Sequence, residues 1–426
     1  MSLTRKLARH IHGKNIDDDD LAAAALFTVD AVANAMAGRR TDPGRKLLDW
    51  AAQYGGRDAG RRALVLGGLT HILEMDDLHR ASVVHPGCVV VPVAFAHSET
   101  SEIGGTETLS AILHGFEAAC RIGMAVGPSH YRIWHSTATC GPFGAAMAAA
   151  SLLGLDEDAT VHALGNAGTQ AAGLWEFLET GAMSKHLHAG RAAEAGLVAA
   201  QLAALGFTGP PKILEGARGL FAGACPDADP GAVLAGPEHN WQLHETSIKP
   251  WPSCRHTHPA VDGALELSPG FDPSAVTGIS VATYGAAVDV CDRPHPDSVY
   301  EAKFSLQHCI AAALTKGRLG FDEFEETARQ ELATLRQKID LKVDDAFEAA
   351  YPDAWGATVE VTFTGGQQRR AERRTCKGDP EAPLAEAELL DKARMLLAFS
   401  GIADPEILIK DILDMANGGN VPALPY

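Results

Sequence analysis

The 426-residue chain lacks several features that would mark a common class of protein. Its 8 cysteines are scattered without a CxxC pair, which is typical of buried thiols in a reducing compartment and not of a disulfide framework. Aromatic residues make up only 6% of the chain, so Ala, Leu and Val must supply most of the core. No stretch reaches the roughly 18 uninterrupted apolar residues of a membrane span. We therefore expect neither disulfides nor a transmembrane helix.

Basic residues are also scarce in this sequence. Lys and Arg together number 36 against 54 Asp and Glu, which gives a formal net charge of −18. An acidic chain of this kind disfavours nucleic acid and anionic membrane surfaces as partners. The first residues contain no apolar signal core. We expect a cytoplasmic protein that binds neither nucleic acid nor membranes.

Common catalytic signatures are missing as well. The sequence has no phosphate-binding glycine loop after a strand, no GxSxG elbow, no HExxH motif and no dinucleotide fingerprint. The polar residues that remain are mainly His, Lys and Asp in apolar surroundings. This composition favours a pocket that works without a metal or an organic cofactor and that moves protons on a small polyanion.

The length predicts two or three domains. Residues 1–243 carry a succession of helical patterns punctuated by Gly and Pro, among them segments at about 60–78, 141–153 and 189–204. Their Ala-rich and Gly-rich stripes are typical of helices that pack closely in a large bundle. We predict an all-helical first domain.

The pattern changes in residues 244–383. Residues 276–284 alternate as a strand, and residues 357–364 and 367–374 predict a hairpin about a Gly-Gly turn. Helical patterns return in residues 384–426 and are expected to rejoin the first domain. The predicted fold class is mainly α, with a large all-helical domain and a smaller α+β domain.

The most informative polar segment lies at residues 71–85. If the helix continues through it, one face carries His71, Glu74, Met75 and Leu78. Asp76 and Asp77 point elsewhere and are expected to orient a ring or cap a helix. The break at Pro86 then presents His85 from a fixed backbone. So many imidazoles and carboxylates in an apolar setting favour proton chemistry.

Two further polar segments follow. The first, at residues 131–144, is predicted to be a loop that carries His135 and several hydroxyls, although the hydroxyls could simply cap a helix. In the second, at residues 181–191, a helix would bring Lys185, His188 and Arg191 near one face. A solvated basic face is the alternative, but the apolar flanks favour partial burial.

The fourth polar segment spans residues 249–259. Its prolines predict a rigid, extended chain on which Cys254, His256 and His258 alternate onto one side. A zinc or iron site is possible there, but no second Cys or His group at familiar spacing completes a tetrahedron. A positively charged clamp for carboxylates explains the segment better.

Taken together and in this order, these segments resemble the 2-methylcitrate dehydratase (MmgE/PrpD) family. The resemblance covers nearly the whole chain and is carried by five strings in register: EMDDLH with the following HPG, WHSTATCGPFGAA, GAMSKHLHAGRAAEAGL, KPWPSC and YEAKFSLQH. It implies a large all-helical domain, a smaller α+β lid domain and a site in the cleft between them. It also implies a homodimer without metal or organic cofactor. Known members include 2-methylcitrate dehydratase, cis-aconitate decarboxylase and iminodisuccinate epimerase.

The resemblance assigns positions to individual residues. It places Glu74 at a carboxylate position, His85 after the acidic segment, and His135, Lys185 and Lys249 in the segments that follow. The sequence departs from decarboxylase-like members at three positions near the expected pocket, namely Leu78 in place of Thr, Cys254 in place of His, and His308 in place of Tyr. These departures argue against an unmodified cis-aconitate decarboxylase activity and favour a substrate other than methylcitrate.

The chemistry shared by the family is the removal or delivery of a proton on a carbon next to a carboxylate. We expect His135 and His85 to act as general acid and base, with Glu74 or Asp76 orienting a ring. Tyr131 is a further candidate acid. Binding of the substrate carboxylates and stabilisation of enediolate charge are assigned to Lys185, Lys249, His188, and His256 or His258. Asp76, Cys254 and His308 are expected to complete the substrate-binding residues.

Three functions remain open from the sequence. The first is a lyase that dehydrates or decarboxylates a small di- or tricarboxylate. The second is an epimerase of an N-substituted aspartate such as iminodisuccinate, because the same acid and base would invert a stereocentre when no group departs. The third is a binding homologue without catalytic activity.

Overall fold

The computed structural model describes residues 1–55, 58–98, 101–236 and 240–424. Contacts divide the chain into two compact units, unit 1 (Met1–Ile248 with Ala385–Tyr426) and unit 2 (Lys249–Leu384). Residues 244–248 belong to unit 1, although the sequence boundary assigned them to the α+β domain. The reason is that β2 (Thr246–Ser247) pairs antiparallel with β1 (Leu78–His79).

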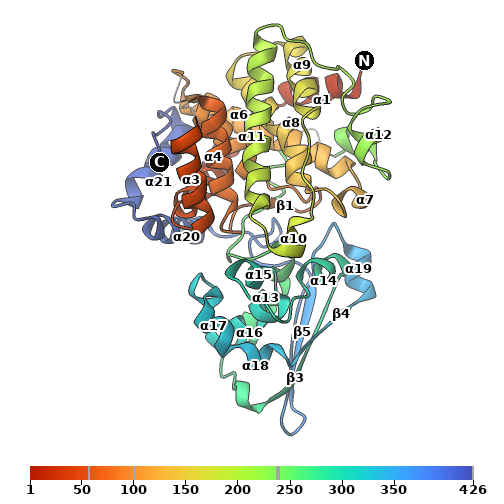
Figure 1. The fold of residues 1–426 in the computed structure, drawn as a ribbon, viewed down its shortest axis with the longest axis vertical. Coiled ribbons are helices and arrows are strands. Elements are labelled where there is room, and N and C mark those ends of the chain that lie inside the picture. The colour runs from red at the N-terminus through yellow and green to blue at the C-terminus, as the bar shows by residue number, and fades with distance from the viewer. Residues whose placement is uncertain (56–57, 99–100, 237–239, 425–426) are drawn as a thin grey trace. The chain divides into compact units, whose positions relative to one another are not determined.

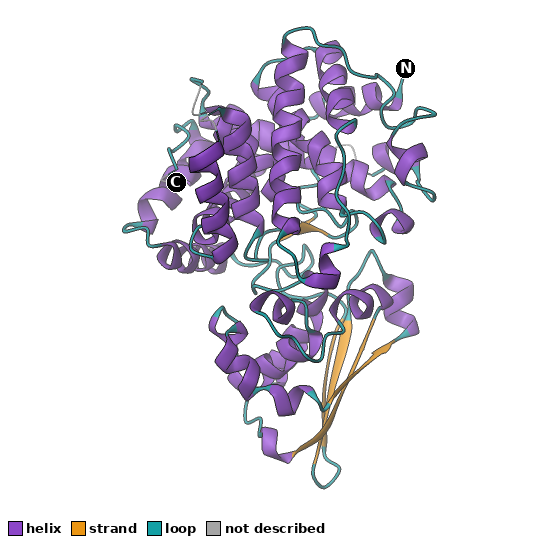
Figure 2. Cartoon of the chain, viewed as in Figure 1, coloured by secondary structure: helices purple, strands orange, loops and turns teal. Residues whose placement is uncertain are grey.

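Among the described residues of unit 1, the regular structure is helical except for the short strands β1 and β2 (Figures 1 and 2). Its α-helices are α1 (Leu3–His12), α2 (Asp18–Gly38), α3 (Asp42–Tyr54), α4 (Ala59–His71), α5 (Gly87–Ser98), α6 (Gly105–Ala125), α7 (Pro128–Tyr131), α8 (Ser136–Leu152), α9 (Glu157–Gly168), α10 (Phe177–Thr180), α11 (Ser184–Ala204), α12 (Leu220–Ala224), α20 (Glu386–Ser400) and α21 (Pro405–Asp414).

Helix α2 is a core helix that resembles a membrane span in composition. It begins at a capping box formed by Asp17 and Asp20, where negative charge favours a helix start. By length and mean hydropathy alone it could cross a membrane, but 83% of its apolar window is buried inside the protein. Its buried Asp30 and Asn34 interrupt the apolar run. These polar groups bond within unit 1, which identifies α2 as part of the helical core.

Helix α11 packs against α4, α8 and α9 and thereby positions one wall of the candidate site (Figure 1). Small residues make this close approach possible. A Cβ atom on Gly190 would lie 2.3 Å from the carbonyl oxygen of Leu64, so a larger residue would push α11 away from α4. The C-terminal helix α20 packs against α2.

Unit 2 combines helices with one four-stranded sheet (Figure 2). The strand order is β4, β3, β5, β6, with β3 and β4 parallel and the other neighbours antiparallel. Helix α13 packs against β5 and β6. The elements are α13 (His258–Leu267), β3 (Val276–Thr283), α14 (Gly285–Cys291), α15 (Val299–Lys303), α16 (Leu306–Lys316), α17 (Glu326–Glu331), α18 (Ala333–Arg336), β4 (Ile339–Val343), α19 (Asp345–Ala350), β5 (Ala357–Phe363) and β6 (Gln368–Arg373).

The predicted strand and hairpin of unit 2 are confirmed as β3 and as β5 with β6. Gly365 and Gly366 both have positive φ, +93° and +82°, as the predicted turn requires. Strand β4 was missed, because its sequence is short and mostly exposed. It joins the sheet in parallel with β3 after a crossover through helices, a pairing that no local pattern indicates.

The helix predicted over residues 60–78 ends earlier in the structure than the sequence indicated. Helix α4 stops at His71, and Glu74 adopts the left-handed conformation with φ of +59°. His71, Glu74, Met75 and Leu78 therefore do not share a helical face. The polar groups of this segment are brought together by a tight loop instead.

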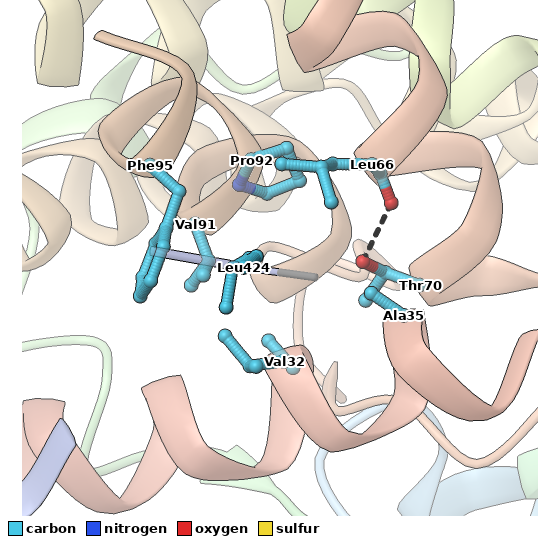
Figure 3. A pocket seen from close by; sticks show the side chains of 9 residues that line it. Val32, Ala35, Leu66, Thr70, Val91, Pro92, Phe95 and Leu424 are labelled. Carbon is cyan, nitrogen blue, oxygen red and sulfur yellow. Dashed lines mark hydrogen bonds between the residues drawn. The ribbon is translucent and has the colours of Figure 1, made fainter. Parts of the chain in front are cut away.

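A small apolar pocket lies between α2, α4 and α5 and is capped by Leu424 (Figure 3). Thr70 on its wall donates a hydrogen bond to the carbonyl oxygen of Leu66 at 2.8 Å. None of the nine lining residues that the structure describes is titratable. This pocket therefore offers no acid or base, and the candidate catalytic residues lie elsewhere in the protein.

Candidate active site

The loop after α4 places a carboxylate against an imidazole. Nδ1 of His71 lies 2.6 Å from an Oδ atom of Asp76, and both side chains are almost completely buried. A carboxylate accepts, so Nδ1 carries the proton of this bond and Nε2 is left for other chemistry. Within the described residues, Nε2 of His71 has no hydrogen-bond partner.

His85 faces the same carboxylate from the end of the loop. Its Nδ1 donates to the carbonyl oxygen of Asp77 at 2.6 Å and lies 3.3 Å from an oxygen of Asp76. Its backbone amide donates to the hydroxyl of Thr137 at 3.0 Å. The His85 ring lies edge-on to His71 with the centroids 4.7 Å apart. Both rings are thus held in fixed orientations around Asp76.

Asp77 has a structural task in this loop. Its two carboxylate oxygens accept from the amide of Gly87 at 3.0 and 3.1 Å, so Asp77 caps the start of α5 as expected. A Cβ atom on residue 87 would lie 2.7 Å from this carboxylate, which explains the glycine. Burial, followed by the negative charge of Asp76, raises the pKa of Asp77 well above its usual value.

Glu74 and Lys185 form a buried ion pair. Nζ of Lys185, from the first turn of α11, donates to both carboxylate oxygens of Glu74 at 2.6 Å. Side-chain exposure is only 4% for Lys185 and 1% for Glu74. The pair joins the strained loop to α11 across 111 residues of sequence.

His135 completes the group of imidazoles. It is the residue before α8. Its ring stacks on His71 with the centroids 5.6 Å apart and lies tilted against Trp175 with the centroids 4.8 Å apart. Its Nδ1 lies 3.4 Å from Nδ1 of His188, whereas its Nε2 has no hydrogen-bond partner among the described residues. Two buried imidazole Nε2 atoms, on His71 and His135, are therefore available for proton transfer.

The local electrostatics keep His135 neutral. Burial, followed by the proximity of His71 and Lys185, lowers the pKa of His135 well below its usual value. Burial and the same neighbours lower the pKa of His188 to about 4. Near neutral pH both rings are uncharged, so each can accept a proton.

Several sequence expectations for this region were wrong. The hydroxyls do not lie in a loop, because α8 begins at Ser136, and none of them caps that helix. Thr139 instead bonds to Nε2 of His130 at 2.8 Å. Arg191 does not join Lys185 and His188, because it is exposed and pairs with Glu194 on the helix surface.

Tyr131 lies at the edge of this group. Its ring is half-buried and stands edge-on to Trp175, with the centroids 5.3 Å apart. Trp175 separates it from His135 in this chain of ring contacts. Tyr131 and His135 thus both contact the same ring, that of Trp175.

One group of side chains in this region has the composition of a metal site. Ligand atoms of His71, Asp76 and Cys88 all lie within 4.8 Å of one another. The 2.6 Å between His71 and Asp76 is shorter than the roughly 3.4 Å that separates two ligands of a tetrahedral zinc ion. Burial, followed by the charges of Asp76 and Asp77, raises the pKa of the Cys88 thiol well above its usual value. The geometry fits a hydrogen-bonded dyad better than a metal centre.

The remaining predicted site residues lie in unit 2. Lys249 is fully buried at the first residue of that unit. We predicted an extended segment after Lys249, and this prediction was wrong. Residues 255–257 form a 3₁₀ turn, and His258 begins α13 with Pro259 as the next residue. Cys254, His256 and His258 therefore do not line one side of a strand, and they form no metal-like group among the described residues.

The histidines of unit 2 have separate environments. His256 stacks on Trp355 at 4.4 Å, and its Nδ1 lies 2.7 Å from the hydroxyl of Tyr284. Nδ1 of His258 accepts from Arg255 at 2.8 Å.

His308 is fixed as a neutral ring within α16. Its Nε2 donates to the carbonyl oxygen of Glu323 at 2.7 Å, and its Nδ1 lies 3.2 Å from the guanidinium of Arg336. Burial, and to a smaller extent Arg336, lowers its pKa to about 4.

Sequence reasoning did not assign a site role to His71 or Trp175. His71 stood in the segment that drew attention first, but the assumed helix placed Glu74 beside it and turned Asp76, its actual partner, away. Its spacing from Asp76 is the signal that could have identified it. Trp175 follows an unremarkable Gly-Leu pair, and only the contact with His135 gives it a role.

Comparison with known proteins adds independent information. The model of the MmgE/PrpD N-terminal domain matches residues 5–232, and the model of the C-terminal domain matches residues 251–414. A cis-aconitate decarboxylase from Aspergillus terreus is 26% identical over 96% of this chain and 91% of its own length. A cis-aconitate decarboxylase-like protein from Aspergillus oryzae is 28% identical over 85% of this chain and 79% of its own length. The Mus musculus cis-aconitate decarboxylase is 25% identical over 92% and 86%.

Proposed function

Since this chain belongs to the MmgE/PrpD family, we propose that it is a lyase of the decarboxylase or dehydratase type acting on a small di- or tricarboxylate. The relatives named above support a decarboxylase in particular. The observation that carries the proposal is the buried group formed by the Asp76–His71 dyad, His135 with an unbonded Nε2, and the Glu74–Lys185 ion pair.

In a decarboxylation, the bond between carbon and the departing carboxylate breaks and carbon dioxide leaves. The electron pair remains on the carbon next to a second carboxylate as an enediolate, and an acid then delivers a proton to that carbon. Fixed cations and hydrogen-bond donors stabilise such charge. Lys185 is the buried cation of unit 1 that adjoins the imidazoles, and His135 or His85 delivers the proton.

The lowered pKa of His135 suits this role. Without a ligand its neighbours His71 and Lys185 oppose protonation. A bound polycarboxylate would bring negative charge next to the ring and raise that pKa, because an opposite charge favours the charged form. His135 would then take up a proton when the substrate binds and return it to the enediolate carbon.

Leu78 supports an alternative within the same family, an epimerase of an N-substituted aspartate. It is 2% exposed and offers no hydroxyl where decarboxylase-like members carry Thr. An epimerase would use two of the imidazoles on opposite faces of one carbon without losing a group.

The experiment is an incubation in deuterated water with 2-methylcitrate, cis-aconitate and N-substituted aspartates. A decarboxylase would release carbon dioxide and incorporate deuterium at the carbon that is protonated, whereas a dehydratase would release water. Deuterium incorporation with inversion and without loss of water or carbon dioxide would establish the epimerase instead. Absence of both exchange and product with the whole panel would overturn all of these and leave a binding role.

We also propose that the protein is a cytoplasmic homodimer that requires no metal or organic cofactor, and that unit 2 serves as a lid. Lys249, Cys254, His256, His258 and His308 remain proposed substrate-binding residues on that unit. Sedimentation of the purified chain would test the dimer, because a monomer at micromolar concentration would contradict it.

A further inference from the structure

The backbone between the two site carboxylates is held by a charged side chain from the C-terminal helix. Nζ of Lys392, on α20, donates to the carbonyl oxygen of Met75 at 2.6 Å. The same ammonium lies 2.5 Å from an oxygen of Asp30 on α2. Nδ2 of Asn34, one turn later on α2, lies 3.4 Å from the same carbonyl and also bonds to Asp30. We name Asp30, Asn34 and Lys392 the Met75 clamp.

The position of this carbonyl matters for the site. The peptide bond between Met75 and Asp76 connects Glu74, which binds Lys185, to Asp76, which binds His71. Glu74 has φ of +59°, a conformation that a residue with a side chain rarely adopts. Such strain persists only when surrounding bonds over-determine it.

The Met75 clamp supplies hydrogen bonds that hold the strained loop from outside it. Lys392 and Asp30 are buried, with side-chain exposures of 5% and 2%, so their ion pair is shielded from water. The charge of Lys392 also reaches the loop itself, where it acts to lower the pKa of Asp77 against burial. The direction of the hydrogen bond is fixed, because an ammonium can only donate and a carbonyl can only accept.

We propose that Lys392, held by Asp30 and Asn34, is a positioning residue that orients Glu74 and Asp76 toward Lys185 and His71. It touches neither imidazole in the bonds described above, and it acts through the Met75 carbonyl. The expected effect on kcat rests on the proposed lyase or epimerase function. The expected effect on hydrogen–deuterium exchange of the loop does not rest on that function.

The chain contains a matched control for this proposal. Lys14 is also buried, with a side-chain exposure of 3%, and also binds one carboxylate and one carbonyl. Its Nζ donates to Glu117 at 2.8 Å and to the carbonyl oxygen of Asn240 at 2.7 Å. The two lysines differ in that only Lys392 binds a carbonyl of the loop at residues 72–79.

The test compares Lys392→Met and Lys14→Met, together with the double variant Lys392→Met/Asp30→Asn. The double variant avoids a stranded buried carboxylate, so it keeps the test valid if Lys392→Met does not fold. Lys14→Met needs no second substitution, because Glu117 keeps its ion pair with Arg121 at 2.6 Å. Lys392→Arg tests rescue, because it restores the charge and a donor. Each folded variant is examined by hydrogen–deuterium exchange of residues 72–79 and by kcat and KM on the substrate found for the wild type.

We expect faster exchange in residues 72–79 and a loss of kcat on the order of 10²-fold for the Lys392 variants, with KM changed less and Lys392→Arg recovering part of kcat. Lys14→Met should retain wild-type exchange in this loop and wild-type kcat. Unchanged exchange in the Lys392 double variant would overturn the proposal, and so would faster exchange with unchanged kcat. If the wild type turns over no substrate, the proposed function fails, and the exchange data still decide whether the clamp holds the loop.

Discussion

Nζ of Lys185 binds both carboxylate oxygens of Glu74 at 2.6 Å inside unit 1. In Lys185→Met, Glu74 would be left as a buried unpaired anion. We expect a loss of about 3–5 kcal/mol in the free energy of unfolding and a loss of turnover of about 100-fold or more. Urea denaturation and steady-state kinetics measure the two effects.

The double variant Lys185→Met/Glu74→Gln separates stability from catalysis. It should recover most of the lost stability, because no buried charge remains without a partner. Turnover should stay low, because the cation is still missing. A double variant with wild-type turnover would remove Lys185 from the mechanism.

Asp76 should matter for activity through the ring that it orients. Asp76→Asn would remove the charge that holds Nδ1–H of His71, and we expect kcat to fall on the order of 10²-fold or more. Asp77→Asn is the matched control, because Asp77 caps α5 and burial already disfavours its charged form. Equal losses of kcat in the two variants would contradict the role given to Asp76.

His308 should make stability depend on pH. Its pKa is about 4 in the folded protein and close to 6.5 in the unfolded chain, so below pH 6.5 the unfolded state binds the proton more readily. The folded state should therefore lose about 3 kcal/mol between pH 6.5 and pH 4, and no further loss from this group is expected at lower pH.

His308→Gln provides the comparison for this effect. The amide can donate to Glu323 and accept from Arg336 without titrating. Unfolding measured from pH 7 to pH 4 should show a shallower decline for the variant than for the wild type. Parallel curves would mean that His308 does not titrate differently on folding.

Activity should survive removal of metal ions. The short contact between His71 and Asp76 fits a hydrogen bond, and the raised pKa of Cys88 keeps a thiol in place of a thiolate ligand. We expect dialysis against EDTA and the substitution Cys88→Ser each to change kcat by less than about twofold. Loss of activity on dialysis, followed by recovery with zinc, would disprove this prediction.

The sequence by itself determined much of the local structure. Alternation with a Gly-Gly turn predicted β3 and the hairpin of β5 and β6. These features depend on turns and side-chain periodicity, which act over a few residues. The same local information identified the four polar segments and the family.

Only the tertiary structure decided how the first polar segment is folded. Residues 72–78 have no Gly or Pro to end the helix, and the sequence therefore predicted that it continues. Lys185 and Lys392 bind this loop from 111 and 317 residues away and stabilise Glu74 at positive φ. Bonds between residues so distant leave no periodic trace in the sequence, which is why the pairing of Glu74 with Lys185 and of His71 with Asp76 had to come from the packed structure.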